Sequence, residues 1–199
     1  YTPAAKQGVA TAQYNLGLMY AKGRGVPQDH KTAVKWLTLA AKQGNAYAQR
    51  VLKQLLEIIF AENFQKSKDA FFKKDYATVF RLLKPLAELG YVRAQGNLGV
   101  MYKHGHGVAQ NDKTAMKWYT LAAEQGNATA QFNLGNGYRT GQGVIQDYKT
   151  AVKWYSLSAN QGNADARLFL GEMYENAQGV IQDYKTAVKW YTLAAEQGN

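Results

Sequence analysis

The chain of 199 residues contains no cysteine and only three prolines. Without thiols it can form neither a disulfide nor a thiolate zinc site, and a cysteine nucleophile is excluded. It also lacks an apolar run of the roughly 18–20 residues that cross a bilayer. The longest apolar stretch, residues 51–60, is interrupted by Lys53, Gln54 and Glu57. We therefore predict no membrane-spanning segment and no fold that depends on disulfides.

Glycine and positive charge are the conspicuous features of the composition. Apolar residues make up 46% and charged residues 19%, which is typical of a globular chain. The 19 glycines, together with so little proline, indicate regular punctuation between many short elements. The formal charge of +10 is concentrated in residues 1–100, which hold fifteen basic and six acidic side chains, whereas residues 101–199 hold nine and eight. Any basic surface is therefore expected in the first half.

A repeat of 36 residues organises most of the sequence. The last three tryptophans are separated by 36 residues each, and the same step separates the glycines that end successive repeats from Gly90 onward. The step from Gly44 to Gly90 is 46 residues, which equals one repeat with an insertion of ten. A fixed period of this kind is the signature of a repeat array. The four tryptophans are Trp36, Trp118, Trp154 and Trp190.

Each repeat predicts two helices joined by a glycine turn. The first helix carries Ala-x-x-x-Leu-Gly-x-x-Tyr on one apolar stripe at helical period. A glycine inside a helix costs about 1 kcal/mol relative to alanine, so we expect close packing to offset it. A Gly-x-Gly-Val turn follows, because glycine suits the left-handed end of a helix. The second helices are expected to begin at side chains that cap free N–H groups, namely Asp29, Asn111, Asp147 and Asp183.

These motifs together resemble a known repeat family. The pattern Ala-x-Ala-Gln-x-x-Leu-Gly-x-x-Tyr, then Gly-x-Gly-Val, Asp-x-x-x-Ala-x-x-Trp and Ala-Ala-x-Gln-Gly, is similar to the Sel1-like repeat, which is slightly longer than the tetratricopeptide repeat. Full motifs cover residues 10–45 and 92–199. The resemblance implies an all-α fold, an α/α solenoid of helical hairpins with a concave binding face, and it favours a bacterial periplasm or cell envelope. The cysteine-rich branch of the family uses disulfides, whereas this chain must rely on packing.

The middle of the chain departs from the pattern. Residues 46–60 begin like another first helix but lose the Leu-Gly-x-x-Tyr motif, and residues 62–73 suggest a separate replacement helix. We therefore predict two subarrays, residues 1–60 and residues 61–199, joined by an irregular hinge. Both ends of the sequence cut the repeat pattern, and solenoids need capping repeats. We accordingly expect the chain to be part of a longer protein or complex.

The sequence offers little support for catalysis. His104 and His106 flank a turn glycine without the further ligands that zinc needs. The Gly-x-Gly loops lack the Gly-Lys-Ser/Thr of a P-loop and recur once per repeat, as turns do. No Ser-His-Asp arrangement is visible. We therefore predict a protein that is not an enzyme, with no cofactor and no metal site.

Two features leave a nucleic-acid function open. The recurring tryptophans and tyrosines could stack on bases, although aromatics on a buried stripe are far more often core residues. A basic cluster lies in residues 61–93 and is either a solvated face or a site for nucleic acid or another polyanion. Its members are Lys66, Lys68, Lys73, Lys74, Arg81, Lys84 and Arg93.

One stripe of the first helices varies from repeat to repeat while the packing residues stay constant. The resemblance places these helices on the concave side, where asparagine amides could hold an extended peptide backbone. The neighbouring row, which includes Phe132, is an alternative inward-facing row. We predict a non-catalytic protein–protein interaction scaffold, with an adaptor that binds polyanions through its basic half as the alternative. The candidate partner-binding residues are Asn15, Leu18, Lys22, Arg93, Asn97, Val100, Thr129, Asn133, Asn136 and Phe169.

Overall fold

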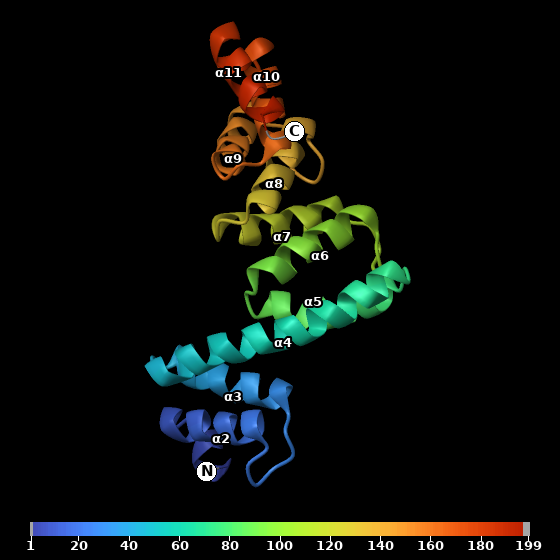
Figure 1. Cartoon of the computed structure of the whole chain (residues 1–199). Coiled ribbons are helices and arrows are strands. Elements are labelled where there is room, and N and C mark those ends of the chain that lie inside the picture. The colour runs from blue at the N-terminus through green and yellow to red at the C-terminus, as the bar shows by residue number, and fades with distance from the viewer. Residues whose placement is uncertain (1, 197–199) are drawn as a thin grey trace. The chain divides into compact units, whose positions relative to one another are not determined.

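The computed structural model describes residues 2–196, and this part of the chain contains eleven helices and no strand (Figure 1). The predicted all-α class is therefore confirmed. In chain order the helices are α1 (Thr2–Lys6), α2 (Ala10–Lys22), α3 (His30–Lys42), α4 (Ala46–Phe72), α5 (Tyr76–Glu88), α6 (Val92–His104), α7 (Asp112–Glu124), α8 (Ala128–Thr140), α9 (Tyr148–Asn160), α10 (Ala164–Glu175) and α11 (Tyr184–Ala195).

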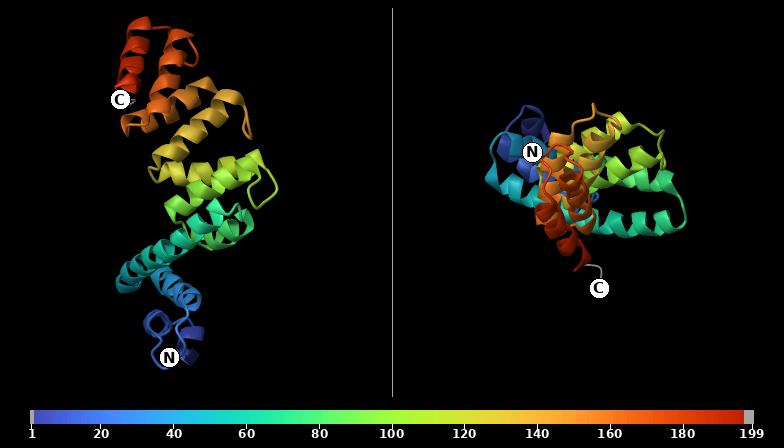
Figure 2. Two further views of the ribbon diagram at one scale, coloured as in Figure 1. Left: turned by 45° about the vertical axis from the view of Figure 1, so that its right-hand side comes forward. Right: turned by 90° about the horizontal axis from the view of Figure 1, so that it is seen from above.

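The chain forms two compact units, residues 1–68 and residues 69–199. In the first unit, α2 packs on α1 and α3, and α3 packs against α4 around a core that includes Leu37 and Leu55. In the second unit, each helix from α5 to α11 packs on the next, so that successive hairpins stack on one another (Figure 2). This arrangement of hairpins confirms the predicted α/α solenoid.

The segment expected to form an irregular hinge is a single helix, α4, which is 27 residues long. It contains neither proline nor a Gly-x-Gly turn, so nothing interrupts its hydrogen-bonded turns. The helix ends where Lys74 adopts a φ of 58° and donates its backbone N–H to the carbonyl of Phe71. A continuous helix thus replaces the expected break between residues 60 and 62. The division between the two compact units falls within α4, and the assignment of subarrays at residues 60 and 61 stays a prediction.

The ends of the repeat helices follow the expected chemistry. The Asp147 carboxylate accepts the backbone N–H groups of Lys149 and Thr150 at 3.0 and 3.2 Å. Gly141 ends α8 with a φ of 75°. Ala177 replaces this glycine in the last repeat and still adopts a φ of 55°, a conformation that costs a non-glycine residue roughly 1–2 kcal/mol. The same N-terminal capping occurs at Asp29, Asn111 and Asp183.

The glycine inside each first helix makes room for a side chain of the second helix. A Cβ at Gly135 would lie 2.6 Å from Cδ1 of Tyr155, which is fully buried, and Gly99 faces Tyr119 in the same way. This close contact is the packing that offsets a helical glycine. The tryptophans are only half-buried, and Trp154 packs against the core of the preceding repeat. The deepest aromatic side chains are therefore Tyr119 and Tyr155, which follow Trp118 and Trp154.

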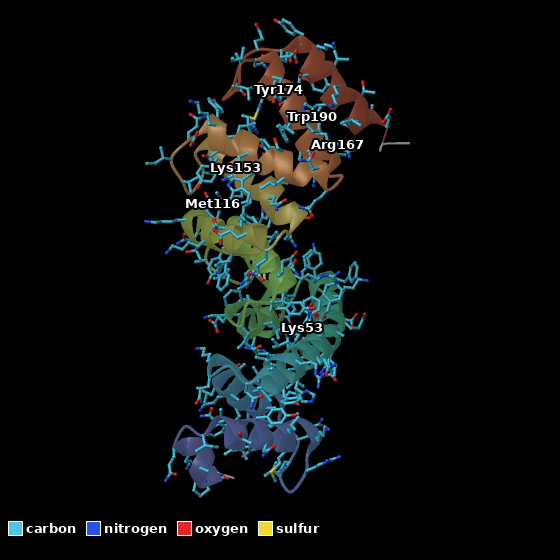
Figure 3. All side chains as sticks on the ribbon, turned by 90° about the vertical axis from the view of Figure 1, so that its left-hand side faces the viewer. Lys53, Met116, Lys153, Arg167, Tyr174 and Trp190 are labelled. Carbon is cyan, nitrogen blue, oxygen red and sulfur yellow. The ribbon has the colours of Figure 1, made fainter. Side chains whose placement is uncertain are left out.

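Buried glutamines connect neighbouring repeats through hydrogen bonds. Gln131 of α8 donates from Nε2 to the carbonyl of Ala123 at the end of α7 (3.1 Å), and its Oε1 accepts from Gln161 after α9 (2.7 Å). One side chain, 4% exposed, thus joins three helices, and we call this arrangement the glutamine link. In α10 the equivalent Arg167 donates to carbonyls of α9 and α11 (Figure 3). The same glutamine pair recurs as Gln13–Gln43 and Gln95–Gln125.

Candidate functional site

The predicted partner-binding residues all lie on first helices, but they belong to two different units. Those on α2 are in the first unit, and the others are on α6, α8 and α10 of the second. In the second unit α6 contacts α8, and the ring of Phe169 on α10 lies 5.9 Å from that of Phe132 on α8. We call the following seven residues the first-helix surface: Arg93, Asn97, Val100, Thr129, Asn133, Asn136 and Phe169. The three on α2 are Asn15, Leu18 and Lys22.

The polar side chains of the first-helix surface differ in how far they are already engaged. Arg93 and Thr129 are exposed, and the other five residues are half-buried. Asn133 donates from Nδ2 to the carbonyl of Thr129 at 3.0 Å, which leaves its oxygen for a ligand. Within the described residues the Asn97 amide has no hydrogen-bond partner, so it offers both a donor and an acceptor.

Between α8 and α10 the first-helix surface is built on an aromatic cluster. The rings of Tyr155 and Phe169 stack with centroids 5.6 Å apart and 12° between their planes, and Phe132 lies 5.9 Å from each. The guanidinium of Arg139 lies 4.6 Å from the centroid of the Phe169 ring, within the range of a cation–π contact. The half-buried rings of Phe132 and Phe169 thus form an apolar platform, with the guanidinium of Arg139 over the Phe169 ring.

The hydroxyl of Tyr155 holds this cluster together. It donates to Oδ1 of Asn136 at 2.7 Å and accepts from Nε of Arg139 at 3.2 Å. Burial raises the pKa of Tyr155 to about 12, although the hydrogen bond and charge of Arg139 oppose the shift. The hydroxyl therefore stays protonated near neutral pH. Because the oxygen of Asn136 is engaged inside the protein, only its NH2 group is left for a ligand.

The sequence interpretation did not single out Arg139 or Tyr155. The sequence nevertheless marks both positions. A tyrosine follows the tryptophan in each of the last three repeats, and Arg139 stands at a position where every repeat has a different residue. What could not be inferred was that the two side chains meet, since they come from different helices. The other repeats have Ala21, Lys103 and Glu175 at the position of Arg139.

The two neighbouring histidines form a stack with a tyrosine. The ring of His106 lies 4.3 Å from that of Tyr76 with 8° between their planes, and His104 lies 5.5 Å from His106. Burial lowers the pKa of His104, and the positive charges of Lys103 and His106 add to the shift. In the described part of the chain no cluster of three or more His, Cys, Asp or Glu side chains could hold a metal ion. No helix among residues 2–196 is long and apolar enough to span a bilayer.

The basic cluster of residues 61–93 is exposed throughout. Lys84 lies 3.9 Å from Glu88. The exposed side chains of the other cations of the cluster can be reached by an acidic partner. Lys66 and Lys68 lie in the first unit, and the other members lie in the second.

Comparison with known sequences identifies one repeat family. Residues 10–45, 92–127, 128–163 and 164–199 each match the Sel1 repeat. The chain is 32% identical over 124 residues, or 62% of its length, to the chitin synthase regulator SKT5 of Saccharomyces cerevisiae. It is 36% identical over 105 residues, or 52% of its length, to DAP3-binding cell death enhancer 1 of Rattus norvegicus. The matches span only 17% and 21% of these two relatives.

Solved structures of Sel1 repeat proteins match nearly the whole chain. A Sel1 repeat protein from Oxalobacter formigenes matches with a TM-score of 0.62 and 32% identity, covering 97% of this chain and 75% of that one. The protective antigen c5321 of uropathogenic Escherichia coli, described as having an SLR fold, matches with a TM-score of 0.51 and 31% identity, covering 100% of this chain and 48% of that one. Since the four matched repeats cover most of the sequence, the chain belongs to the Sel1 repeat family.

Proposed function

We propose that this chain is a non-catalytic scaffold that binds a protein or peptide partner on the first-helix surface of its second unit. Sel1-repeat proteins are generally protein-interaction scaffolds, and the relatives named above are a regulator and a binding protein. The family and these names support a role in protein association. The assignment of the surface rests on the structure of the chain itself.

The observation that carries the proposal is a variable surface on a constant frame. The buried leucine of the first helix is the same in each repeat of the second unit and at most 1% exposed. The first and third of three neighbouring positions differ in every repeat of the second unit, and the second holds asparagine twice and then phenylalanine. This is the arrangement that recognition of one particular partner requires. In successive repeats these positions hold Arg93, Thr129 and Asp165, then Asn97, Asn133 and Phe169, then Val100, Asn136 and Glu172.

The first-helix surface offers three kinds of contact to a partner. Phe169, together with Phe132 of the neighbouring row, can bury an apolar side chain, and aromatic and arginine side chains contribute strongly to protein interfaces. The amides of Asn97 and Asn133 can bond the backbone of an extended segment. Arg93 adds a cation at one end. The surface therefore suits an extended segment that carries an apolar side chain.

Site-specific photocrosslinking tests the location of the partner. A benzoylphenylalanine at position 133 on the first-helix surface should capture the partner covalently in cells. The matched control carries the same group at position 153, since Lys153 is exposed on α9, a second helix (Figure 3). Capture of the same protein from position 153 but not from position 133 would refute the assignment to the first helices.

The affinity for the captured protein tests the individual contacts. Because each net hydrogen bond contributes about 0.5–1.5 kcal/mol, the double variant Asn97→Ala/Asn133→Ala should bind about 1–3 kcal/mol more weakly. The temperature of unfolding should change little, because both side chains are only half-buried and the one hydrogen bond that is lost, from Asn133 to Thr129, is exposed to solvent. Leu98→Ala is the contrasting variant: its side chain is fully buried, so its loss should cost about 2–5 kcal/mol of stability. Unchanged affinity of the double Asn variant would contradict the proposal.

The exposed basic cluster supports a second candidate function, binding of nucleic acid or another polyanion. Such binding releases counterions, so the logarithm of the affinity for a single-stranded oligonucleotide should fall linearly with the logarithm of salt concentration. Replacing Lys66, Lys73, Lys74 and Arg81 together by glutamine should abolish it. We expect this binding to be weak at physiological salt. Tight and sequence-selective binding there would reverse the order of the two functions.

A further inference from the structure

The first helices of the second unit change in charge in a regular order along the stack, from α6 through α8 to α10 (Figure 1). The α6 helix carries two basic and no acidic side chains, α8 carries one basic side chain, and α10 carries three acidic side chains and one basic. The stack of first helices is therefore positive at α6 and negative at α10, and we call this order the charge gradient. Its members are Arg93 and Lys103 on α6, Arg139 on α8, and Asp165, Arg167, Glu172 and Glu175 on α10.

The second helices of the same unit do not follow this order. Within its bounds α7 holds two basic and two acidic side chains, and α9 and α11 each hold two basic side chains and no acidic one. From α7 to α11 the charge of the second helices thus becomes more positive, whereas that of the first helices becomes negative. The charge gradient is therefore a property of the first helices and not of the general composition of the chain.

Helix stability does not account for the charges of Arg93 and Glu172. Arg93 is the second residue of α6, near the positive end of the helix dipole, and Glu172 lies in the last turn of α10, near the negative end. Both placements oppose the dipole, which favours acidic side chains at the N-terminus of a helix and basic ones at its C-terminus. Lys103 and Asp165, by contrast, are placed as the dipole favours. Arg93 and Glu172 therefore need another explanation.

Arg93 and Glu172 are also accessible, whereas other members of the charge gradient are engaged inside the protein. Arg93 is exposed and Glu172 is half-buried, and within residues 2–196 neither side chain makes a hydrogen bond. The Glu175 carboxylate accepts from the hydroxyl of Tyr191 at 2.6 Å, and Arg167 donates to carbonyls of the two neighbouring helices. Arg93 and Glu172 can therefore pair with charges of a ligand.

On α10 two carboxylates lie one turn before and one turn after the ring of the apolar platform. Asp165 precedes Phe169 by four residues and Glu172 follows it by three, so the three side chains share one face of the helix. Arg139 contacts the Phe169 ring and the Tyr155 hydroxyl, and in the described part of the chain no ion pair joins it to Glu172. A basic group next to an apolar side chain that binds on Phe169 will therefore meet a carboxylate.

We propose that the first-helix surface binds a protein segment whose charges are separated, with acidic side chains over α6 and basic side chains over α10. The inference rests on the proposed function, because it specifies the partner of the same surface. Arg93 pairs with the acidic end of the segment, and Asp165 and Glu172 pair with its basic end. Because like charges repel, α10 disfavours a segment that lies the other way round and a uniformly acidic polymer such as nucleic acid.

The spacing of the helices sets the length of the segment. Packed helices lie roughly 10 Å apart, so two steps from α6 to α10 span roughly 20 Å. An extended chain advances about 3.3 Å per residue, which places about six residues between the acidic and the basic end. The probe is therefore the blocked peptide acetyl-Glu-Glu-Ser-Ser-Leu-Ser-Ser-Lys-Lys-amide. Its control has the same composition with mixed ends, acetyl-Glu-Lys-Ser-Ser-Leu-Ser-Ser-Lys-Glu-amide.

Titration of the whole chain with each peptide, followed by nuclear magnetic resonance at physiological salt, tests the charge gradient. The peptide with separated charges should bind at least fivefold more tightly than the mixed one. Arg93→Glu/Glu172→Lys keeps the net charge of the chain and removes the gradient, so this preference should fall below twofold. The unfolding temperature should hold or rise, because both new charges agree with the helix dipole. The matched exchange Lys117→Glu/Glu124→Lys, at two exposed positions of α7, should leave the preference unchanged.

A nitroxide attached to one end of the peptide tests its orientation. At the glutamate end it should broaden the amide signal of Asn97 on α6, and at the lysine end that of Phe169 on α10. The reverse pattern, equal binding of the two peptides, no saturable binding, or an unchanged preference in Arg93→Glu/Glu172→Lys would overturn the proposal. So would displacement of the peptide by an equal concentration of a single-stranded oligonucleotide.

Failure of this proposal differs from failure of the proposed function. If crosslinking from position 133 captures a partner whose affinity is unchanged by Arg93→Glu/Glu172→Lys, the charge pattern falls and the scaffold function stands. If the partner is captured from position 153 but not from position 133, the assignment to the first helices falls and this inference falls with it.

Discussion

The same change at two equivalent tyrosines should have opposite effects on stability. Tyr119 and Tyr155 are both at most 2% exposed, and each packs its ring against a helical glycine. Tyr155→Phe removes a hydrogen bond to Asn136 and one from Arg139. Two bonds of about 0.5–1.5 kcal/mol each predict a loss of about 1–3 kcal/mol. Tyr119→Phe removes a buried hydroxyl that has no partner within residues 2–196, so stability should be unchanged or rise by up to about 1 kcal/mol.

Urea unfolding followed by circular dichroism measures the difference between the two variants. The unfolding midpoint should fall for Tyr155→Phe and hold or rise for Tyr119→Phe, with the same dependence on urea in both, because neither change alters the surface exposed on unfolding. The difference in unfolding free energy between the variants should be about 1–4 kcal/mol. Equal losses in both would show that the Tyr119 hydroxyl is satisfied in solution, and the reasoning from burial would then fail.

Three further predictions follow from the packing and the buried polar groups. Gly135→Ala should lower the free energy of unfolding by about 1–2 kcal/mol, because overpacking against Tyr155 outweighs the gain in helix propensity. Gly96→Ala should raise it by about 0.5–1 kcal/mol in the same urea assay, because its Cβ would meet nothing closer than 3.9 Å. Gln131→Ala breaks two hydrogen bonds of the glutamine link and should lower the free energy of unfolding by about 2–3 kcal/mol. Gln146→Ala breaks exposed hydrogen bonds and should lower it by less than about 1 kcal/mol, so similar losses in the two variants would contradict the role of burial. The pKa of Tyr155 is raised to about 12 from an ordinary value of 10, so its contribution should be complete below pH 10 and lost as pH rises towards 12; a pH series of unfolding midpoints should show a smaller alkaline decline in Tyr155→Phe.

Much of the fold follows from local chemistry that the sequence displays directly. The period of 36 residues can be read from the sequence itself. The capping residue Asp147 and the turn glycine Gly141 each act within a few residues of chain, so their roles could be predicted without coordinates. The α4 helix could not, because its insertion lost the motif that guided the interpretation. The loss of the Leu-Gly-x-x-Tyr motif predicts an irregular hinge, whereas a segment without proline or glycine gives the helix no reason to end before Lys74.

The candidate site was only partly accessible for a different reason. The variable positions on the first helices were visible as differences between aligned repeats. The bonds of Tyr155 were not, because they join α9 to α8 and depend on the angle at which two helices cross. The pair Met116 and Gly137 was partly accessible. The sequence shows that the other repeats have valine and methionine at these two positions. Only the structure shows that a side chain at position 137 would collide with the sulfur of Met116.

The glutamine link has a consequence for recognition. Apolar packing already limits how two helices fit together, and a buried side chain that bonds one particular carbonyl further fixes their relative position along the helix axis. Gln131 and Gln95 each make such a bond to the helix before them. The hairpins that begin with α6 and α8 are therefore each held at a defined position along the axis of the helix before them. A partner that fits the side chains of one repeat will find those of the next at a fixed interval, so it can recognise spacing as well as chemistry.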